Sequence, residues 1–409
     1  MKLSIIGLGY IGIPTATFFA KNNVDVIGVD VSEQKVNLLN SGKIDITEPG
    51  LGEMFKEAVE NKKFIAKTQP EAADAFIICV PTPFKDNYEP DLSYIKSAVE
   101  SIAPILEKGN IVILESTSPV GTTEKIAEWI GEIRSDLKVP YENFEESDIY
   151  IAYCPERMIP GNVFELVKND RIIGGINKTS TQKVKELYSI IAEGELILTN
   201  VRTAEMSKLT ENSFRDVNIA FANELSMICD KLNIDVFELI NVANHHPRVN
   251  ILQPGCGVGG HCIAVDPWFI VNRTPNEAKL IKQSREVNDY KPEFVIEKVM
   301  NAVKELKLDN PKITCFGLAF KPNIDDLRES PALGICKKLS KKFENVLAVE
   351  PNIKVLPPVL QHENVELVSF EDGLKSDVLV MLVEHNEFKN IQPKINNSQR
   401  IVDTRGIWK

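Results

Sequence analysis

The first 200 residues alternate short apolar runs with longer segments in which apolar residues recur every three or four positions. The short β-branched runs predict buried strands, and the wider spacing predicts amphipathic helices. The predicted strands are Lys2–Gly7, Asp25–Asp30, Ala75–Val80, Ile111–Glu115, Ile149–Cys154 and Arg171–Gly174. The predicted helices include Ser32–Ser41, Leu92–Glu107 and Thr122–Glu132. This alternation favours a doubly wound parallel sheet, because parallel neighbours need crossover connections.

From residue 201 the pattern changes to sustained helix. Val201–Leu232 contains no Pro or Gly, and Glu277–Lys307 stays helical in pattern apart from Pro292. Alternation then returns, and the predicted strands are Lys312–Phe316, Val346–Glu350, Val365–Val368, Val378–Val383 and Ile401–Asp403. The predicted fold class is therefore α/β, with two doubly wound domains joined by a central helical domain. We place the three domains at residues 1–200, 201–307 and 308–409.

A glycine motif lies between the first predicted strand and the helix after it. It reads Gly7-Leu8-Gly9-Tyr10-Ile11-Gly12. In a G-x-G-x-x-G motif the first glycine permits a tight turn, the second lets the backbone approach a pyrophosphate, and the third allows close helix packing. Asp30 ends the next strand, where a carboxylate binds ribose hydroxyls and repels a 2′-phosphate. The motif predicts a Rossmann domain that binds NAD rather than NADP, the alternative being a nucleotide-free α/β domain.

Two threonines follow the carboxyl ends of further predicted strands, Thr82 after Val80 and Thr117 after Glu115. Ligands of open α/β sheets bind at this edge, so both threonines are candidate cofactor neighbours. The alternative is that their hydroxyls only stabilise turns.

Four polar residues form a stripe on the otherwise apolar helix predicted from residue 201, namely Glu205, Lys208, Asn212 and Arg215. At about 100° per residue they lie within an arc of about 80°. Charged side chains on a buried helix need partners or a ligand, so the stripe predicts a functional face. The alternative is an intrahelical Glu205–Lys208 ion pair on a wetted surface.

The segment Gln253–Cys262 contains four glycines in ten residues. Such a run costs conformational entropy on folding, and it indicates close approach of the backbone to a ligand. Cys262 at its end is a candidate nucleophile. One alternative is a zinc site that includes Cys256, His261 and Cys262, and another is a buried structural cysteine.

Composition limits the classes of ligand and compartment. Lys and Arg number 47 against 58 for Asp and Glu, which gives a net charge of −11 and argues against a nucleic-acid-binding protein. The seven cysteines are an odd number, mostly inside apolar runs, which indicates reduced thiols in the cytoplasm. No apolar run approaches the ~18 residues of a membrane span.

Taken together, these motifs resemble the UDP-glucose/GDP-mannose dehydrogenase family over essentially the whole chain. The segments that carry the resemblance are Gly7–Gly12, Tyr153–Arg157, Ala204–Asn218 and the loop ending at Cys262. The resemblance implies oxidation of the C6 alcohol of a nucleotide sugar to a carboxylate with two NAD. The segment His246–Phe269 points to UDP-N-acetyl-D-mannosamine, with UDP-N-acetylglucosamine, UDP-glucose and GDP-mannose as alternatives.

The resemblance also implies catalytic roles. Cys262 would capture the aldehyde as a thiohemiacetal, whose oxidation gives a thioester. Lys208 and Asn212 would stabilise the oxyanion, and Lys208 would also handle the proton. Asp266 would assist water or tune Lys208, and Glu156 would act as an acidic helper. The chemistry agrees, because a thiol retains an aldehyde that would otherwise diffuse away, and a cation and an amide suit a tetrahedral intermediate.

Further ligand contacts follow from the same resemblance. The implied substrate contacts are Arg157, Met158, Lys208, Asn212, Arg215, His246, Arg248, Gly259, Phe320, Lys321 and Arg405. Arg248 would reach the neighbouring active site of a homodimer, and Arg328 would reach toward NAD. For each cation the alternative is a solvated surface charge. A second acid found in the UDP-glucose branch is replaced here by Pro160.

Two other functions fit parts of this pattern. A two-electron dehydrogenase of the hydroxyacid type shares the NAD domain and a catalytic lysine but needs no thiol. A nucleotide-sensing protein would bind both ligands without producing NADH.

Overall fold

The computed structural model describes residues 1–46, 48–141, 146–158, 161–260, 262–389, 391, 393 and 398–408. The chain divides into two compact units, Met1–Thr210 and Glu211–Lys409. Helix α8 (Val201–Leu232) crosses this boundary, and its length agrees with the helix predicted from the sequence.

The first unit contains an eight-stranded sheet in the order β3-β2-β1-β4-β5-β6-β7-β8. Its strands are β1 (Lys2–Ile6), β2 (Asp25–Val29), β3 (Phe64–Lys67), β4 (Ala75–Ile78), β5 (Ile111–Leu114), β6 (Tyr150–Tyr153), β7 (Arg171–Gly175) and β8 (Leu196–Asn200). The first six follow the order 3-2-1-4-5-6 of dinucleotide-binding folds, in which the strand order reverses between β1 and β4. The predicted doubly wound parallel sheet is confirmed here, and five of these six strands were predicted.

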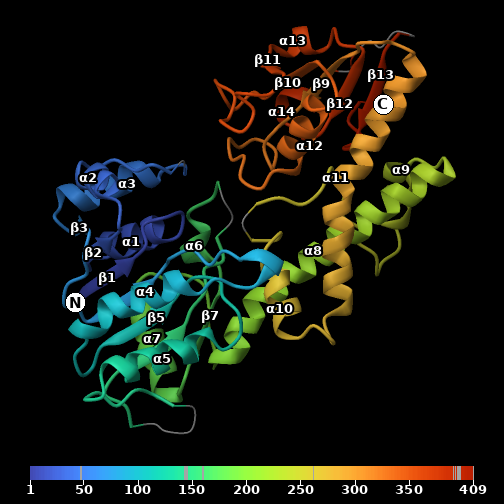
Figure 1. Cartoon of the computed structure of the whole chain (residues 1–409). Coiled ribbons are helices and arrows are strands. Elements are labelled where there is room, and N and C mark those ends of the chain that lie inside the picture. Colours follow the sequence, from blue (N-terminus) through green and yellow to red (C-terminus); the bar gives the residue numbers. More distant parts are fainter. Residues whose placement is uncertain are drawn as a thin grey trace. The chain divides into compact units, whose positions relative to one another are not determined.

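Helices cover both faces of this sheet (Figure 1). They are α1 (Gly12–Lys21), α2 (Glu33–Asn40), α3 (Leu51–Glu60), α4 (Ser93–Ile102), α5 (Thr122–Ile133), α6 (Glu165–Lys168) and α7 (Lys178–Tyr188), with short 3-10 turns η1 (Asp86–Tyr88) and η2 (Ala103–Ile105). Leu3 and Ile5 of β1 face one buried cluster, and Ile6 faces the other. Burial on both faces explains why these strands are continuous apolar runs.

The edge of the sheet departs from the prediction in two ways. Strand β7 runs antiparallel to β6, and Ala152 pairs with Gly175 there. The described residues between the two strands, 154–158 and 161–170, contain the one-turn helix α6 in place of the long helical crossover typical of a parallel pair. Strands β3 and β8 were not predicted. Phe64–Lys67 is a short run, whereas β8 begins with the apolar run Leu196–Leu198, which was missed.

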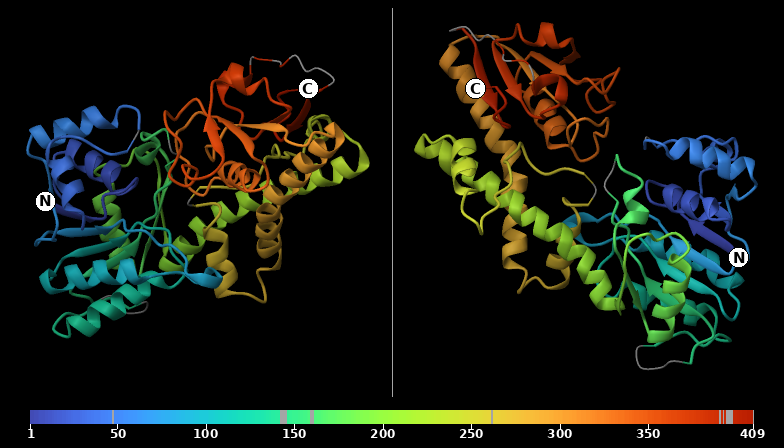
Figure 2. Two further views of the ribbon diagram at one scale, coloured as in Figure 1. Left: turned by 45° about the horizontal axis from the view of Figure 1, so that its top comes forward. Right: turned by 180° about the vertical axis from the view of Figure 1, so that it is seen from behind.

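The second unit combines long helices with a five-stranded parallel sheet in the order β11-β10-β9-β12-β13. Its helices are α9 (Val236–Ala243), α10 (Asp266–Arg273), α11 (Lys279–Leu306), α12 (Pro331–Ser340), α13 (Phe370–Gly373) and α14 (Asn386–Lys389). Its strands are β9 (Lys312–Phe316), β10 (Asn345–Val349), β11 (Val365–Leu367), β12 (Val378–Met381) and β13 (Arg400–Asp403). Helix α11 crosses α8 and also packs against α12 and β13 (Figure 2). The predicted α/β class with central helices and a second doubly wound sheet is confirmed.

The two sheets begin with the same turn. Gly7 and Gly317 follow β1 and β9 with φ of +95° and +87°. The N–H of Gly7 donates to Val29 O, and that of Gly317 to Val349 O, each at 2.8 Å. An acid follows the second strand in both cases, Asp30 after β2 and Glu350 after β10.

The two acids differ in the number of hydrogen bonds that they accept from the protein. Asp30 accepts two backbone N–H groups, from Leu8 at 3.3 Å and Ser32 at 3.0 Å. Glu350 is buried and accepts from the N–H groups of Leu318, Ala319 and Asn352 and from the Asn352 amide, while His385 Nε2 lies 3.0 Å from its Oε2.

None of the described helices is long and apolar enough to cross a lipid bilayer.

Candidate active site

The glycine turn after β1 has the shape that a dinucleotide requires. A Cβ on Gly7 would lie 2.7 Å from Cys79 O, and one on Gly12 would lie 1.9 Å from Gly7 O, so neither position accepts a side chain. A Cβ on Gly9 would meet nothing within 4 Å. The turn is therefore closed where the protein packs against itself and open at the glycine assigned to the pyrophosphate. These residues fit NAD.

The start of α1 and the end of β2 complete this region. The N-cap Ile11 gives no side-chain hydrogen bond to the first turn of α1. Ile13 N–H donates to Gly9 O at 3.1 Å and Pro14 has no N–H, so at most the Gly12 N–H of this turn can serve a phosphate oxygen. Tyr10 beside it is half-buried. Asp30 lies against the turn through the Leu8 N–H, which is the predicted place for a carboxylate that binds ribose.

The structure brings the two predicted threonines together. Thr82 Oγ1 donates to the carbonyl oxygen of Thr117. Ser116 Oγ also donates to Val80 O at 2.6 Å, so side chains connect the ends of β4 and β5. Contact of either threonine with the cofactor stays a prediction.

A buried ion pair supports the same strand ends and was missed from the sequence. Glu115 Oε1 accepts from Arg171 Nη1 at 2.8 Å, and both side chains are buried. Glu115 Oε2 accepts from Thr15 Oγ1 at 3.2 Å and from Cys79 Sγ at 3.4 Å. One carboxylate thus joins α1, β4, β5 and β7. The signal for it was the position of Glu115 at the end of an apolar strand.

The first two members of the predicted polar stripe on α8 take separate partners in the first unit. Glu205 is buried and caps α5, accepting from Gly121 N–H at 2.6 Å, Thr123 N–H at 2.8 Å and Thr123 Oγ1 at 2.7 Å. Burial raises the pKa of the Glu205 carboxyl to about 6. Lys208 Nζ donates to Glu156 O at 2.8 Å and Oε1 at 3.2 Å, so two of the predicted catalytic residues are in contact.

The other two members of the stripe lie in the second unit. Asn212 Nδ2 donates to Asp266 Oδ2 at 2.5 Å, which brings two further predicted residues together, whereas Arg215 is exposed. The carbonyl of Cys262 accepts from the N–H groups of Val265 and Asp266 at 3.0 and 2.9 Å, which forms the turn into α10. Asp266 is buried at the start of this helix.

The two cysteines of the loop differ in solvent exposure. Cys262 is exposed, which contradicts the alternative of a buried structural cysteine. Cys256 is buried, and this burial raises the pKa of its thiol to about 11. The thiolate is the reactive form, so Cys262 is the better nucleophile of the pair.

The predicted ligand-binding cations have different surroundings. Arg405 Nη1 donates to Pro254 O at 2.8 Å, and its guanidinium forms an ion pair with Glu384. Arg328 pairs with Asp326, and Arg157 Nη1 donates to Asp170 O at 3.0 Å. Met158 is buried, Phe320 and Lys321 are half-buried, and His246 and Arg248 are exposed. A Cβ on Gly259 would lie 2.9 Å from the Phe320 Cβ, so the loop is closely packed. Each role in ligand binding stays a prediction.

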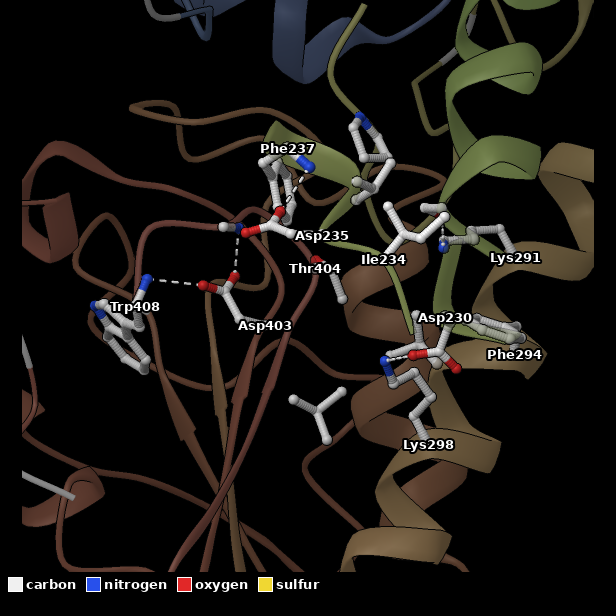
Figure 3. A pocket seen from close by; sticks show the side chains of 16 residues that line it. Asp230, Ile234, Asp235, Phe237, Lys291, Phe294, Lys298, Asp403, Thr404 and Trp408 are labelled. Atoms are coloured by element: carbon white, nitrogen blue, oxygen red, sulfur yellow. Dashed lines mark hydrogen bonds and ion pairs between the residues drawn. The ribbon is translucent and has the colours of Figure 1, made fainter. Parts of the chain in front are cut away.

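A pocket of about 260 Å³ in the second unit was not predicted. Figure 3 shows Lys291 and Lys298 on one side of it and Asp403 and Trp408 on the other. Burial lowers the pKa of Lys291 to about 8, and its ammonium donates to Ser226 Oγ.

Among the described residues no group of three or more His, Cys, Asp or Glu side chains could hold a metal ion. His261, which belongs to the zinc alternative, and Pro160 lie outside the described residues.

Models of three domains match the chain. They are described as the UDP-glucose/GDP-mannose dehydrogenase family NAD binding domain at residues 1–192, central domain at 202–290 and UDP binding domain at 314–409. A UDP-N-acetyl-D-mannosamine dehydrogenase of Campylobacter jejuni is 60% identical over 396 residues, which cover 96% of this chain and 97% of that protein. An NDP-N-acetyl-D-galactosaminuronic acid dehydrogenase of Ralstonia nicotianae is 54% identical over 99% of this chain and 96% of its own.

Among solved structures, the UDP-N-acetyl-mannosamine dehydrogenase Cap5O of Staphylococcus aureus has a TM-score of 0.86 and 42% identity. The match covers 100% of this chain and 96% of that chain.

Proposed function

Because the chain belongs to the UDP-glucose/GDP-mannose dehydrogenase family, we propose that it oxidises the C6 alcohol of UDP-N-acetyl-D-mannosamine to the carboxylate with two NAD. The observation that carries the choice of sugar is the 60% identity to the Campylobacter jejuni enzyme along nearly the full length of both chains. A second candidate sugar is N-acetyl-D-galactosamine, favoured by the 54% identity to the Ralstonia nicotianae protein.

We assign the covalent chemistry to Cys262. Its exposed thiol would add to the C6 aldehyde and form a thiohemiacetal, whose oxidation gives a thioester. Water then releases the carboxylate and restores the thiol. NAD supplies the two-electron acceptor for each of the two oxidations.

Lys208 and Asn212 are assigned to the oxyanion of the tetrahedral intermediates. The Lys208 ammonium is buried and oriented by Glu156, so little reorganisation is needed during the reaction. The Asn212 amide is oriented by the Asp266 carboxylate. Asp266 and Glu156 are the candidate groups for handling protons and water during thioester hydrolysis.

We retain the three predicted domains at residues 1–200, 201–307 and 308–409, and a homodimer formed through the central one. Exposed apolar residues recur on α8 at intervals of one heptad, at Phe214, Phe221 and Ile228, with exposed fractions of 69%, 53% and 46%. A stripe of this kind buries well against a second copy. In such a dimer Arg248 would contact the neighbouring active site. We place the enzyme in the cytoplasm, where the exposed Cys262 thiol stays reduced.

The test is NADH yield from a panel of UDP sugars carrying N-acetylmannosamine, N-acetylgalactosamine, N-acetylglucosamine and glucose. We expect two NADH per uronate with the first sugar and a much lower kcat/KM with the others. One NADH per substrate would favour the hydroxyacid-type alternative, and none a sensor. Cys262→Ser should lose uronate formation while NAD binding survives, and uronate formation by this variant at the wild-type rate would exclude Cys262 from the mechanism.

A further inference from the structure

Helix α8 holds the cysteine loop, residues 253–266, at both ends. Asn212 Nδ2 donates to Asp266 Oδ2 after the cysteine, and Asn223 Oδ1 accepts the Gly255 N–H at 2.9 Å before it. The two asparagines are eleven residues apart (223 − 212). At about 100° and 1.5 Å per residue they share a helix face to within about 20° and are separated by about 16 Å along the axis. One rigid helix therefore sets the distance between the ends of the loop.

Asn223 belongs to a chain of hydrogen bonds that runs from the loop to a buried ion pair. Asn223 Nδ2 donates to Asn288 Oδ1 at 2.9 Å, and Asn288 Nδ2 donates to Asp216 Oδ1 at 2.8 Å. Arg285 Nη1 donates to the same Asp216 oxygen at 2.7 Å. This series of hydrogen bonds connects α8 to α11 and ends at the ion pair between Asp216 and Arg285.

The groups at the two ends of this hydrogen-bond series fix the donor and the acceptor of every bond in it. The Gly255 N–H can only donate, and the ionised Asp216 carboxylate can only accept. The two amides between them must therefore both present oxygen toward Gly255 and nitrogen toward Asp216. All four side chains are at least 98% buried, so water cannot replace a lost partner easily.

Residues 254–260, the start of the loop, transmit this constraint because they are tightly packed. Arg405 holds the carbonyl of Pro254, the residue before Gly255, at 2.8 Å. A Cβ on Gly257 would lie 2.8 Å from Pro331. Close packing on the segment after Gly255 leaves little room for the loop to shift independently of its anchor.

We propose that Asn223 is a positioning residue that fixes the start of the cysteine loop and thereby places Cys262 for capture of the aldehyde. This inference rests on the proposed function. It deepens that function because α8, which carries the oxyanion-stabilising amide of Asn212, would also set the position of the nucleophile Cys262 through Asn223.

The decisive variant is Asn223→Asp, which keeps shape and places an acceptor opposite Asn288 Oδ1. Misplacing the thiol should lower kcat by roughly 10–100-fold. The ratio of NADH to uronate should also rise above two, because aldehyde formed in the first oxidation leaves before capture. This ratio does not depend on how much of the variant is folded. The matched control is Asn218→Asp on the same helix, whose amide donates to Phe214 O within α8.

A second pair of variants tests the direction of the chain and covers the case in which Asn223→Asp folds poorly. Asn288→Asp sets two carboxylates against each other, whereas Asn288→Asp combined with Asp216→Asn returns the cluster to one carboxylate. Because Arg285 Nη1 and Asn288 Nδ2 donate to the same Asp216 oxygen, the exchange leaves Arg285 Nη1 opposite an amide NH₂ group, so we expect it to recover only part of the activity that Asn288→Asp loses. An exchange no more active than Asn288→Asp alone would overturn the assigned direction.

Two measurements need no turnover and separate this inference from the proposed function. Asn223→Asp should change the iodoacetamide alkylation rate of Cys262 and raise hydrogen exchange in the peptide containing Gly255. If wild type turns over no sugar but both changes occur, the proposed function fails and the anchoring stands. An unchanged alkylation rate together with a ratio of two would overturn the positioning role.

Discussion

Removing the charge of Glu205 should change the pH dependence of stability in the first unit in a predictable direction. Burial raises the pKa of this carboxyl from 4.5 to about 6. A carboxyl whose pKa is higher in the folded state contributes most stability below its unfolded pKa, and that contribution is lost as pH rises through the folded value. At about 1.36 kcal/mol per pKa unit, the loss between pH 4.5 and pH 7.5 is about 2 kcal/mol.

The variant Glu205→Gln carries no charge at any of these pH values. Its amide oxygen can still accept from Thr123, but its NH₂ group faces the Gly121 N–H, which costs about 1 kcal/mol at every pH. We therefore expect the variant to be less stable than wild type at pH 4.5 and to gain about 2 kcal/mol relative to wild type by pH 7.5.

Urea unfolding followed by Trp129 fluorescence measures this difference, because Trp129 lies on α5, the helix that Glu205 caps. Phe in place of Trp268 and Trp408, the other two tryptophans, isolates the signal. Glu128→Gln, at an exposed position on α5, controls for the substitution itself. A stability difference between wild type and Glu205→Gln that stays constant from pH 4.5 to 7.5 would refute the reasoning.

Three further outcomes are expected. Gly9→Ala should leave the melting temperature unchanged but weaken NAD binding in titration calorimetry, because its Cβ meets only open space, whereas Gly12→Ala should impair folding. Arg171→Met should destabilise the first unit by about 3–5 kcal/mol in urea, because it leaves Glu115 buried without its cation, and a cost below 1 kcal/mol would contradict this. Phe221→Asp should convert a dimer to monomer in analytical ultracentrifugation, and an unchanged mass would place the interface elsewhere.

The sequence predicted the parts of the fold that depend on local patterns. The absence of Pro and Gly from Val201–Leu232 identified α8 to the residue, and the glycine spacing identified the turn that the structure keeps open at Gly9. Helix Leu92–Glu107 was predicted too long, since α4 ends at Ile102 and Pro104 lies in the 3-10 turn that follows. Strand β7 was predicted, but its antiparallel direction was not, because strand direction depends on the path of the whole connection.

Side-chain partners were the least predictable part of the site. Helical spacing placed Glu205, Lys208, Asn212 and Arg215 on one face, yet the first three bind different elements that are distant in sequence. Spacing reports the direction in which a side chain leaves the helix and carries no information about what it meets. Asn223 lies three helical turns after Asn212, and this spacing could have placed it on the same helix face. Its contact with Gly255 could be identified only from the folded structure.

The repeated glycine turn has a consequence for ligand competition. A carboxylate offers about four lone-pair positions. Asp30 uses two of them on its own backbone, whereas Glu350 receives four N–H contacts besides His385. Protein groups therefore occupy the lone-pair positions of Glu350, and a ribose hydroxyl at the second turn would find no free acceptor on this carboxylate. The chain can in this way contain two similar glycine turns without binding the same dinucleotide at both.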